Sequence, residues 1–258
     1  MARYFLEVAY KGTRYSGFQV QQNANTIQAE VEKAFNILHG LPTLFSPQGV
    51  GPGVRLTGCS RTDAGVHALQ NYFHFDFDKS LHPQFLFKIN AILPNDIVIK
   101  NVHAMPPAAH ARFDAVSREY EYRLYQKKNP FLSGAALYYP YKIDKELMNE
   151  AAAIVKDQTN FFAFTKTNTQ VSNFNCSISR SKWLSKGDLY IYYIAGNRFL
   201  RGMVRLLTAS MLLVGRHKLS FEDFTALFKT TTLKSGASVA ASGLYLIHVH
   251  FPDDYFGE

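Results

Sequence analysis

One segment constrains the fold more than any other part of the chain. In residues 71–78, NYFHFDFD, phenylalanine recurs at every second position. Because side chains alternate between the two faces of a β-strand, this period of two predicts a strand with one aromatic face. That face carries Phe73, Phe75 and Phe77. The opposite face is left to Tyr72, His74 and Asp76.

Strand and helix patterns alternate through the first half of the chain. Residues 27–38 carry apolar side chains at helical spacing, with Asn25 or Thr26 placed to cap the helix and Gly40 to end it. Residues 41–53 are rich in proline and glycine and predict a loop. The predicted order is strand, helix, strand, strand, helix, strand, over residues 3–10, 27–38, 54–58, 71–78, 82–93 and 97–103.

The second half has a similar order of elements but little sequence identity to the first. Strands are predicted at residues 118–126, 179–185, 189–195 and 244–250. Helices are predicted at residues 144–155 and 197–214, and Ser220 is placed to cap a shorter one. Leu147, Ala151 and Ile154 form the apolar stripe of the 144–155 helix.

These patterns predict an α+β fold of two similar lobes, each built on mainly antiparallel sheet with helices on one side. Met105, Pro106 and Pro107 are typical of a hinge or a crossover, which divides the chain into residues 1–107 and 108–258. Alternating strands and helices also occur in a parallel doubly wound sheet. The two pairs of adjacent strands and the lack of a phosphate-binding loop argue against that alternative.

Composition narrows the classes of partner and of site. The net charge is +8, and the chain holds 15 Tyr and 21 Phe, which suits a nucleic-acid partner but equally a basic protein whose aromatics fill its core. Cys59 and Cys176 are far apart and in no CxxC pair, which excludes a disulfide scaffold and a structural zinc site. The apolar run 206–215 is about half of a membrane span. Since the start carries Glu7 and is typical of a strand, we expect no signal peptide and a cytoplasmic protein.

The segment GCSRTDAGVHA, residues 58–68, holds the strongest candidate for chemistry. Asp63 follows a short predicted strand, lies next to a glycine-containing turn, and has Arg61 two residues before it. Catalytic groups are common on such loops. An aspartate in such a turn also commonly bonds its own backbone two residues on, so the residues alone leave both roles open.

Two further candidates lie in the second half. Arg198, Arg201 and Arg205 are spaced for one face of the predicted 197–214 helix, in its first half, where the helix dipole disfavours cations. A carboxylate such as Asp63, or RNA phosphate, would offset that cost. Tyr120 shares a predicted strand face with Tyr122, which is consistent either with cross-strand packing or with a ring that stacks on a base.

Together the motifs resemble the TruA-type tRNA pseudouridine synthases over nearly the whole chain. The matching segments occur in order: YKGTRYSGFQVQ, RTDAGVHA, INAILPNDI, HARFDAVSREYEYRLY, FLRGMVRLLTASMLLVG and GLYLIHVHFP. The resemblance implies conversion of uridine to pseudouridine at tRNA positions 38 to 40, without a cofactor or metal. It also implies a pseudouridine synthase fold with the site in a central cleft, and a homodimer that grips one tRNA.

The resemblance also assigns residues. Asp63 matches the family's catalytic aspartate, Tyr120 its active-site tyrosine, and Arg61 and Arg205 its active-site arginines. We expect an arginine near Asp63 to favour its ionised form. We expect phosphate contacts from Lys11, Arg14 and Arg198. The loop of residues 46–53 is longer than in common relatives, which leaves the exact RNA contacts and targets open.

Overall fold

The computed structural model describes residues 1–41, 53–166, 172–236 and 238–257. The predicted long loop of residues 46–53 lies almost wholly outside them. The chain forms two compact units, Met1–Val116 with His248–Glu258, and Ser117–Ile247. Within the described ranges, no helix is long and apolar enough to cross a membrane.

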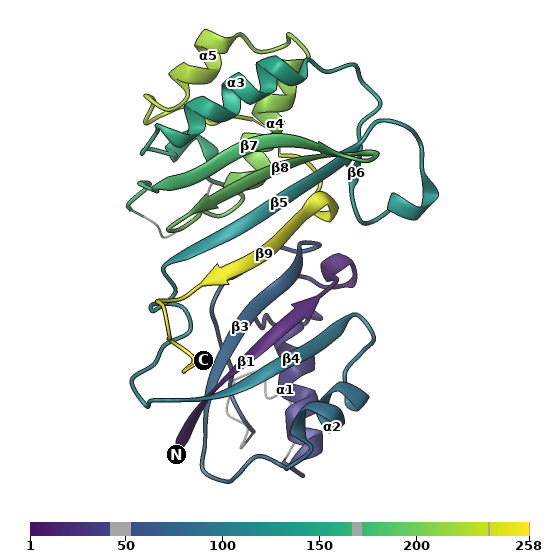
Figure 1. Ribbon diagram of the computed structural model, residues 1–258, viewed down its shortest axis with the longest axis vertical. Coiled ribbons are helices and arrows are strands. Elements are labelled where there is room, and N and C mark those ends of the chain that lie inside the picture. Colours follow the sequence, from purple (N-terminus) through teal and green to yellow (C-terminus); the bar gives the residue numbers. More distant parts are fainter. Residues whose placement is uncertain (42–52, 167–171, 237, 258) are drawn as a thin grey trace. The chain divides into compact units, whose positions relative to one another are not determined.

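The first unit is built on an antiparallel sheet with β1 at its centre (Figure 1). β1 (Ala2–Tyr10) pairs with β3 (His67–Phe77) on one side and with β4 (Ile97–Met105) on the other. The short β2 (Thr57–Gly58) pairs with β3. Two helices, α1 (Ile27–Leu38) and α2 (Phe85–Ile92), complete the unit, and the Thr26 hydroxyl caps α1 as predicted.

The aromatic face of β3 forms the core of this unit. The Phe35 ring of α1 meets Phe75 and Phe77 edge-on at centroid distances of 5.0 and 5.1 Å, and also contacts Phe85 of α2. Phe73 is fully buried as well. The predicted aromatic face is therefore confirmed, and it is the face that the helices cover.

The opposite face of β3 is covered in part by another segment. Tyr72 and His74 are also buried, because the C-terminal segment packs there. Phe251 and Phe256 contact the Tyr72 ring at 5.2 and 5.5 Å. Phe256 further contacts Phe5 and His103, on β1 and β4. A period of two identifies the faces of a strand, but it does not show which distant segment covers them.

The same contacts place the boundary of the first unit away from the predicted hinge. Residues 108–116 stay with the first unit, where the Ala111 N–H donates to His74 and the Tyr255 hydroxyl donates to Asp114. The compact units therefore divide the chain at 116/117 and again within the last strand. The assignment of functions to lobes 1–107 and 108–258 stays a prediction.

The second unit has β8 (Leu189–Gly196) paired antiparallel with β5 (Ser117–Tyr125) and with β7 (Ile178–Lys186). The short β6 (Leu137–Tyr138) pairs parallel with β5, and the chain returns to the first unit within β9 (Leu244–His250). The pairings of β1, β3, β4, β5, β7 and β8 confirm the mainly antiparallel α+β prediction over the parallel doubly wound alternative. Short 3₁₀ turns lie at Gly12–Arg14, Pro130–Leu132, Phe162–Phe164 and Ala241–Gly243.

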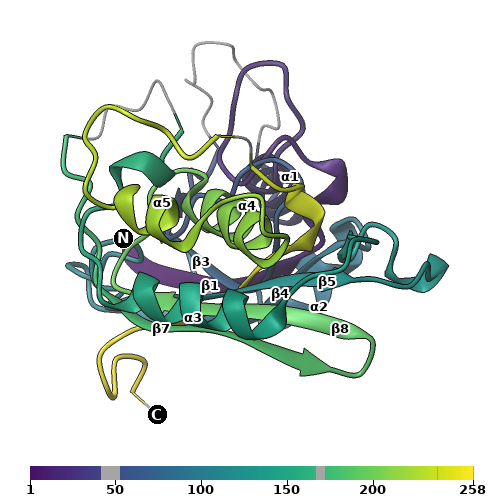
Figure 2. The ribbon, with the colours of Figure 1, turned by 90° about the horizontal axis from the view of Figure 1, so that it is seen from above.

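Three helices belong to the second unit: α3 (Lys145–Lys156), α4 (Met203–Gly215) and α5 (Phe221–Ala226). Figure 2 shows α4 beside α5, and α3 along β7. Asp144 caps α3, and Ser220 caps α5 as predicted. The apolar stripe predicted for α3 was wrong by one position: Met148, Ala151, Ala152 and Val155 are its buried residues, whereas Leu147 and Ile154 are partly exposed.

The long helix predicted over residues 197–214 was wrong at its start. α4 begins at Met203, and Gly202 precedes it with φ +76°, in the left-handed region that a right-handed helix cannot include. Arg198 and Arg201 therefore lie in the irregular segment before the helix, and only Arg205 is in its first turn. The three arginines do not share a helix face.

We predict that Phe35→Ala lowers the free energy of unfolding by about 3–5 kcal/mol, because it opens a cavity among three rings in a fully buried site. Urea unfolding, followed by circular dichroism, measures the change. The matched control is Phe131→Ala, which truncates a ring that is 91% exposed and should change stability by less than about 0.5 kcal/mol. Equal losses in the two variants would contradict this account of the core.

Candidate active site and nucleic-acid interface

Asp63 lies on the connection between β2 and β3, on a loop that two neighbouring segments hold. The Thr62 hydroxyl is hydrogen-bonded to the Tyr10 hydroxyl at 2.8 Å, and the Thr62 carbonyl accepts from the Phe18 N–H at 3.1 Å. The Asp63 carbonyl accepts from the Val66 N–H, which closes the turn around Gly65. The Asp63 side chain is partly exposed. The loop therefore presents a carboxylate from a backbone fixed on both sides of it.

The side chain of Asn71, on β3, is the main anchor of this loop. It is fully buried. Its Oδ1 accepts from the Ser60 and Tyr72 N–H groups at 3.2 and 2.9 Å, and its Nδ2 donates to the Ser60 carbonyl at 2.8 Å and to the Tyr10 hydroxyl at 3.2 Å. Every hydrogen-bonding direction of the amide is used, so its burial carries no unpaired polar group.

Two glycines let the preceding loop approach the Asp63 loop closely. A Cβ built on Gly12 would lie 1.9 Å from the Val66 carbonyl oxygen, so no side chain fits there. Gly17 has φ +117°, and a Cβ there would lie 3.2 Å from the Thr62 carbonyl oxygen. The glycines of YKGTRYSGFQVQ are thus explained by contact with the loop that carries RTDAGVHA.

Asp96 organises the basic part of the same loop. The Arg14 guanidinium pairs with the Asp96 carboxylate at 2.8 Å, and the Tyr15 hydroxyl donates to its other oxygen at 2.6 Å. These donors hold the pKa of Asp96 below its ordinary value despite partial burial. The Arg14 side chain remains 68% exposed, and Lys11 is exposed. Lys11 and Arg14, two of the three cations predicted to contact phosphate, therefore lie at the surface of the first unit.

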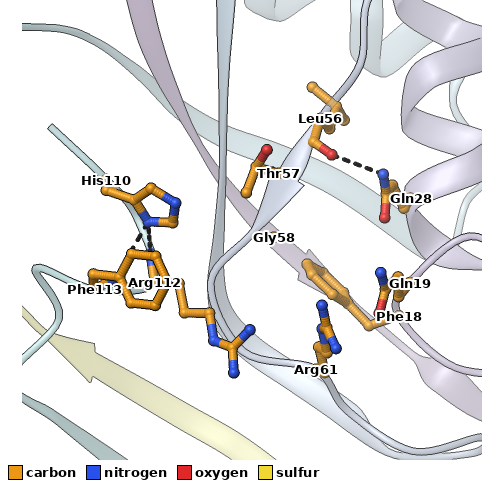
Figure 3. A pocket seen from close by; sticks show the side chains of 10 residues that line it. All are labelled: Phe18, Gln19, Gln28, Leu56, Thr57, Gly58, Arg61, His110, Arg112 and Phe113. Carbon is orange, nitrogen blue, oxygen red and sulfur yellow. Dashed lines mark hydrogen bonds between the residues drawn. The ribbon is translucent and has the colours of Figure 1, made fainter. Parts of the chain in front are cut away.

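A cavity of about 200 Å³ adjoins the Asp63 loop within the first unit. Figure 3 shows Arg61 beside Phe18 and Gln19 on one side of it, and Arg112 near His110 and Phe113 on the other. The Phe113 ring is 74% exposed. The motifs RTDAGVHA and HARF thus line one cavity, which combines two guanidinium groups with an exposed ring. Cations for phosphate and a ring for base stacking are the groups that single-stranded RNA sites use.

His74 positions the HARF side of this cavity. Its Nδ1 accepts from the Ala111 N–H at 3.3 Å, and its ring lies 4.4 Å from the His110 ring. Burial, with help from nearby His110 and Arg3, lowers the pKa of His74 to about 4. The imidazole is therefore neutral at pH 7, as an Nδ1 acceptor must be.

Tyr120 and Arg205 lie in the second unit, Tyr120 on β5 and Arg205 in the first turn of α4. The Tyr120 ring meets Phe199 edge-on at 5.0 Å, beside Arg198 in the chain. The Arg205 Nε donates to the Val239 carbonyl at 2.8 Å, and the hydroxyl of the buried Tyr122 donates to the next carbonyl, that of Ala240, at 2.8 Å. The face of β5 that carries both tyrosines therefore packs beside the start of α4.

The structure brings some predicted site residues together within each unit. Asp63 and Arg61 share one loop of the first unit, near the loop of Lys11 and Arg14, while Tyr120, Arg198 and Arg205 belong to the second unit. Sequence reasoning missed Asn71 and His74 as positioning residues. Each is a polar residue on a predicted strand, which could have indicated a structural role. The sequence spacing does not show which residue it would bond.

Comparison with known proteins covers the whole chain. A tRNA pseudouridine synthase A of Porphyromonas gingivalis is 40% identical over 99% of this chain and 100% of its own length. One of Parabacteroides distasonis is 36% identical over 99% and 98%. The profile of the family described as tRNA pseudouridine synthase matches residues 157–252. The chain belongs to this family. The resemblance found in the sequence is confirmed, and so is the assignment as an isomerase.

A synthase of Staphylococcus aureus, 33% identical over 98% of this chain and 93% of its own, extends the similarity beyond the two relatives above.

We predict that Asn71→Ala destabilises the protein by about 1–3 kcal/mol, because it leaves buried backbone groups of Ser60 without their partner. The larger effect should fall on turnover: a displaced loop lowers kcat while tRNA affinity changes little. Single-turnover rates and filter binding separate the two. The control is Leu69→Ala, on the same strand and exposed. A variant that lost stability but kept full kcat would show that Asn71 does not position the loop.

We also predict that the free energy of unfolding decreases as the pH falls from 6.5 to 4. Because the folded-state pKa of His74 is below its unfolded value, the stabilisation is complete above pH 6.5 and is lost as the pH falls toward 4, by an amount of order 2–3 kcal/mol. His74→Gln keeps an acceptor for Ala111 and should flatten the pH dependence of unfolding in that window. His217→Asn, which removes an exposed imidazole, should not. Parallel curves for wild type and His74→Gln would refute the prediction.

Proposed function

We propose that this protein converts uridine to pseudouridine at positions 38 to 40 of the tRNA anticodon arm, with Asp63 as the catalytic nucleophile. One observation carries the proposal. In a chain that matches tRNA pseudouridine synthases from end to end, Asp63 of RTDAGVHA is partly exposed on a backbone held by Thr62, Tyr10 and Asn71. A fixed and accessible carboxylate is what this reaction requires.

The reaction breaks the bond between C1′ of the ribose and N1 of uracil, and forms a bond between C1′ and C5. The C5 proton is lost and N1 gains one, so atoms balance without an electron or group carrier. Asp63 can act in three ways: by attack at C6 of the base, by attack at C1′, or by removal of a ribose proton. All three need an ionised carboxylate.

The other proposed catalytic residues follow from their chemistry. Arg61 and Arg205 supply positive charge for the negatively charged RNA. Tyr120 stacks on the target base and lies near the proton that leaves C5. Because the target base must leave its stack, at a cost of a few kcal/mol, Arg61 also fills the space that the base vacates. Asp63, Arg61, Tyr120 and Arg205 are the proposed catalytic residues, as the family resemblance assigns them.

Substrate binding is assigned to three cations, of which Lys11 and Arg14 are exposed and Arg198 is partly exposed. Lys11, Arg14 and Arg198 contact phosphates, with Arg14 held ready by Asp96. The cavity lined by Arg61, Arg112 and Phe113 takes an unpaired nucleotide next to the target. The enzyme works in the cytoplasm as a homodimer that grips one tRNA. These points rest on the family resemblance and on the surface position of the cations.

Two alternatives keep part of this assignment. A related synthase with shifted or broader targets would keep all four catalytic residues and differ in its RNA contacts. A tRNA-binding protein without activity would not need them, and the presence of Asp63, Arg61, Tyr120 and Arg205 speaks against it. Mapping of pseudouridine in reacted tRNA separates the first alternative from the proposal.

We predict that tRNA transcripts carrying tritium at C5 of uridine release tritium with wild-type protein and not with Asp63→Asn. The amide keeps the shape of the carboxylate but removes its charge, so the rate should fall by at least about 10³-fold while tRNA affinity and stability are retained. Filter binding and urea unfolding check retention. Release by both proteins would refute the role of Asp63. Release by neither, across several tRNAs that both bind, would favour the protein without activity.

A further inference from the structure

A second cavity, of about 350 Å³, lies wholly within the second unit and is not used by the catalytic residues above. Three of its lining residues are the cations Lys166, Arg201 and Lys234, and Thr165 and Ser238 add hydroxyl groups. None of the described residues that line it is acidic. Its charge and its donors suit an anion.

Hydrogen bonds hold the three segments that build this cavity in place. The Lys166 N–H donates to the Arg201 carbonyl at 3.0 Å, and the Ser235 N–H donates to the Ala163 carbonyl at 2.9 Å. The Lys234 ammonium donates to the Phe162 carbonyl at 2.8 Å and lies 3.5 Å from the Phe162 ring centroid. The cations are therefore presented by fixed backbone.

Thr165 points independently to a ligand. The residue is 3% exposed, lines the cavity, and its Oγ1 has no hydrogen-bond partner among the described residues. A buried hydroxyl without a partner costs free energy in the unbound protein, so it is expected where a ligand completes its bonding. Partial burial also lowers the pKa of Lys234, which a bound anion would reverse.

The start of α4 adds a third contribution. Gly202, the residue before α4, packs against the Lys166 side chain, and Leu206 in the first turn lines the cavity. The positive end of the 13-residue helix is thus at the cavity.

We propose that this cavity binds one backbone phosphate of the tRNA substrate, through Lys166, Arg201, Lys234 and the Thr165 hydroxyl. The inference rests on the proposed function for the identity of the RNA, and it names a contact point in addition to Lys11, Arg14 and Arg198. A phosphodiester suits donors from separate segments because its oxygens are arranged tetrahedrally, whereas the two oxygens of a carboxylate lie in one plane.

Filter binding of tRNA at several salt concentrations tests the site. Arg201→Gln removes one cation and should weaken binding on the order of 10-fold and lower the slope of log Kd against log salt by about 0.7–0.9. Thr165→Val keeps the shape but removes the hydroxyl. It should weaken binding on the order of 10-fold with an unchanged salt slope, because no charge is lost. Lys156→Gln, on an exposed residue of α3, is the matched charge control.

Thr165→Val also separates binding from structure. Removal of a buried hydroxyl without a partner should leave the Tm unchanged or raise it, whereas a structural role would lower it. Unchanged affinity and slope in both variants would overturn the proposal. A third outcome concerns free phosphate: inorganic phosphate raises the Tm of the wild type but not of Arg201→Gln, while both bind tRNA equally well. That outcome would assign the cavity to free phosphate and overturn the proposal that it binds RNA.

The outcome is independent of the catalytic assignment. If wild-type protein binds tRNA in a way that depends on this cavity but forms no pseudouridine at positions 38 to 40, the proposed function fails and the phosphate site stands. If pseudouridine forms at the wild-type rate in both variants at subsaturating tRNA, the phosphate site fails and the proposed function stands.

Discussion

The first unit depends on one buried amide. Asn71 lies at zero exposure on a strand whose neighbours are aromatic, where an unpaired amide would be costly. Its four hydrogen bonds remove that cost, and three of them reach Ser60 and Tyr10, outside its own strand segment. Because all four bonds require the observed conformation of the loop, they fix the backbone that carries Asp63. A loop rich in small and polar residues gains in this way the rigidity that a catalytic group needs.

The second support of that loop is steric. Gly12 and Gly17 bring a neighbouring loop into backbone contact with residues 62–66, and Phe18, from that loop, stacks on Phe73 with ring centroids 4.4 Å apart. The Asp63 loop is thereby connected to the aromatic core through Phe18, and to the surface cations through Arg14 and Asp96. Side chains proposed to bind RNA and the side chain proposed to react with it share one support.

Sequence predicted elements whose signals are local. The strand containing Phe73, Phe75 and Phe77 and the caps at Thr26 and Ser220 follow from spacing within a few residues. The start of α4 could not be predicted from local spacing. The sequence shows a glycine at position 202, but it does not show that this glycine adopts the positive φ that precedes the helix. Asp63 stood out by its turn, but the partners of Asn71 and His74 lie 11 and 37 residues away in the chain. The burial of Tyr72 and His74 by the C-terminal segment is likewise a long-range contact that no local pattern encodes.

The proposed isomerisation gives a physical reason for cavities that suit phosphates and bases. The isomerisation exchanges one bond at C1′ for another, so no carrier supplies driving force, and the cost of unstacking the base must come from RNA binding. Each unit offers charged groups that suit this proposal: Arg61 and Arg112 with an exposed ring line a cavity in the first, and Lys166, Arg201 and Lys234 line one in the second. Phosphate contacts carry no sequence information. Under the proposed function, the choice among uridines must therefore come from features of the RNA other than these phosphate contacts.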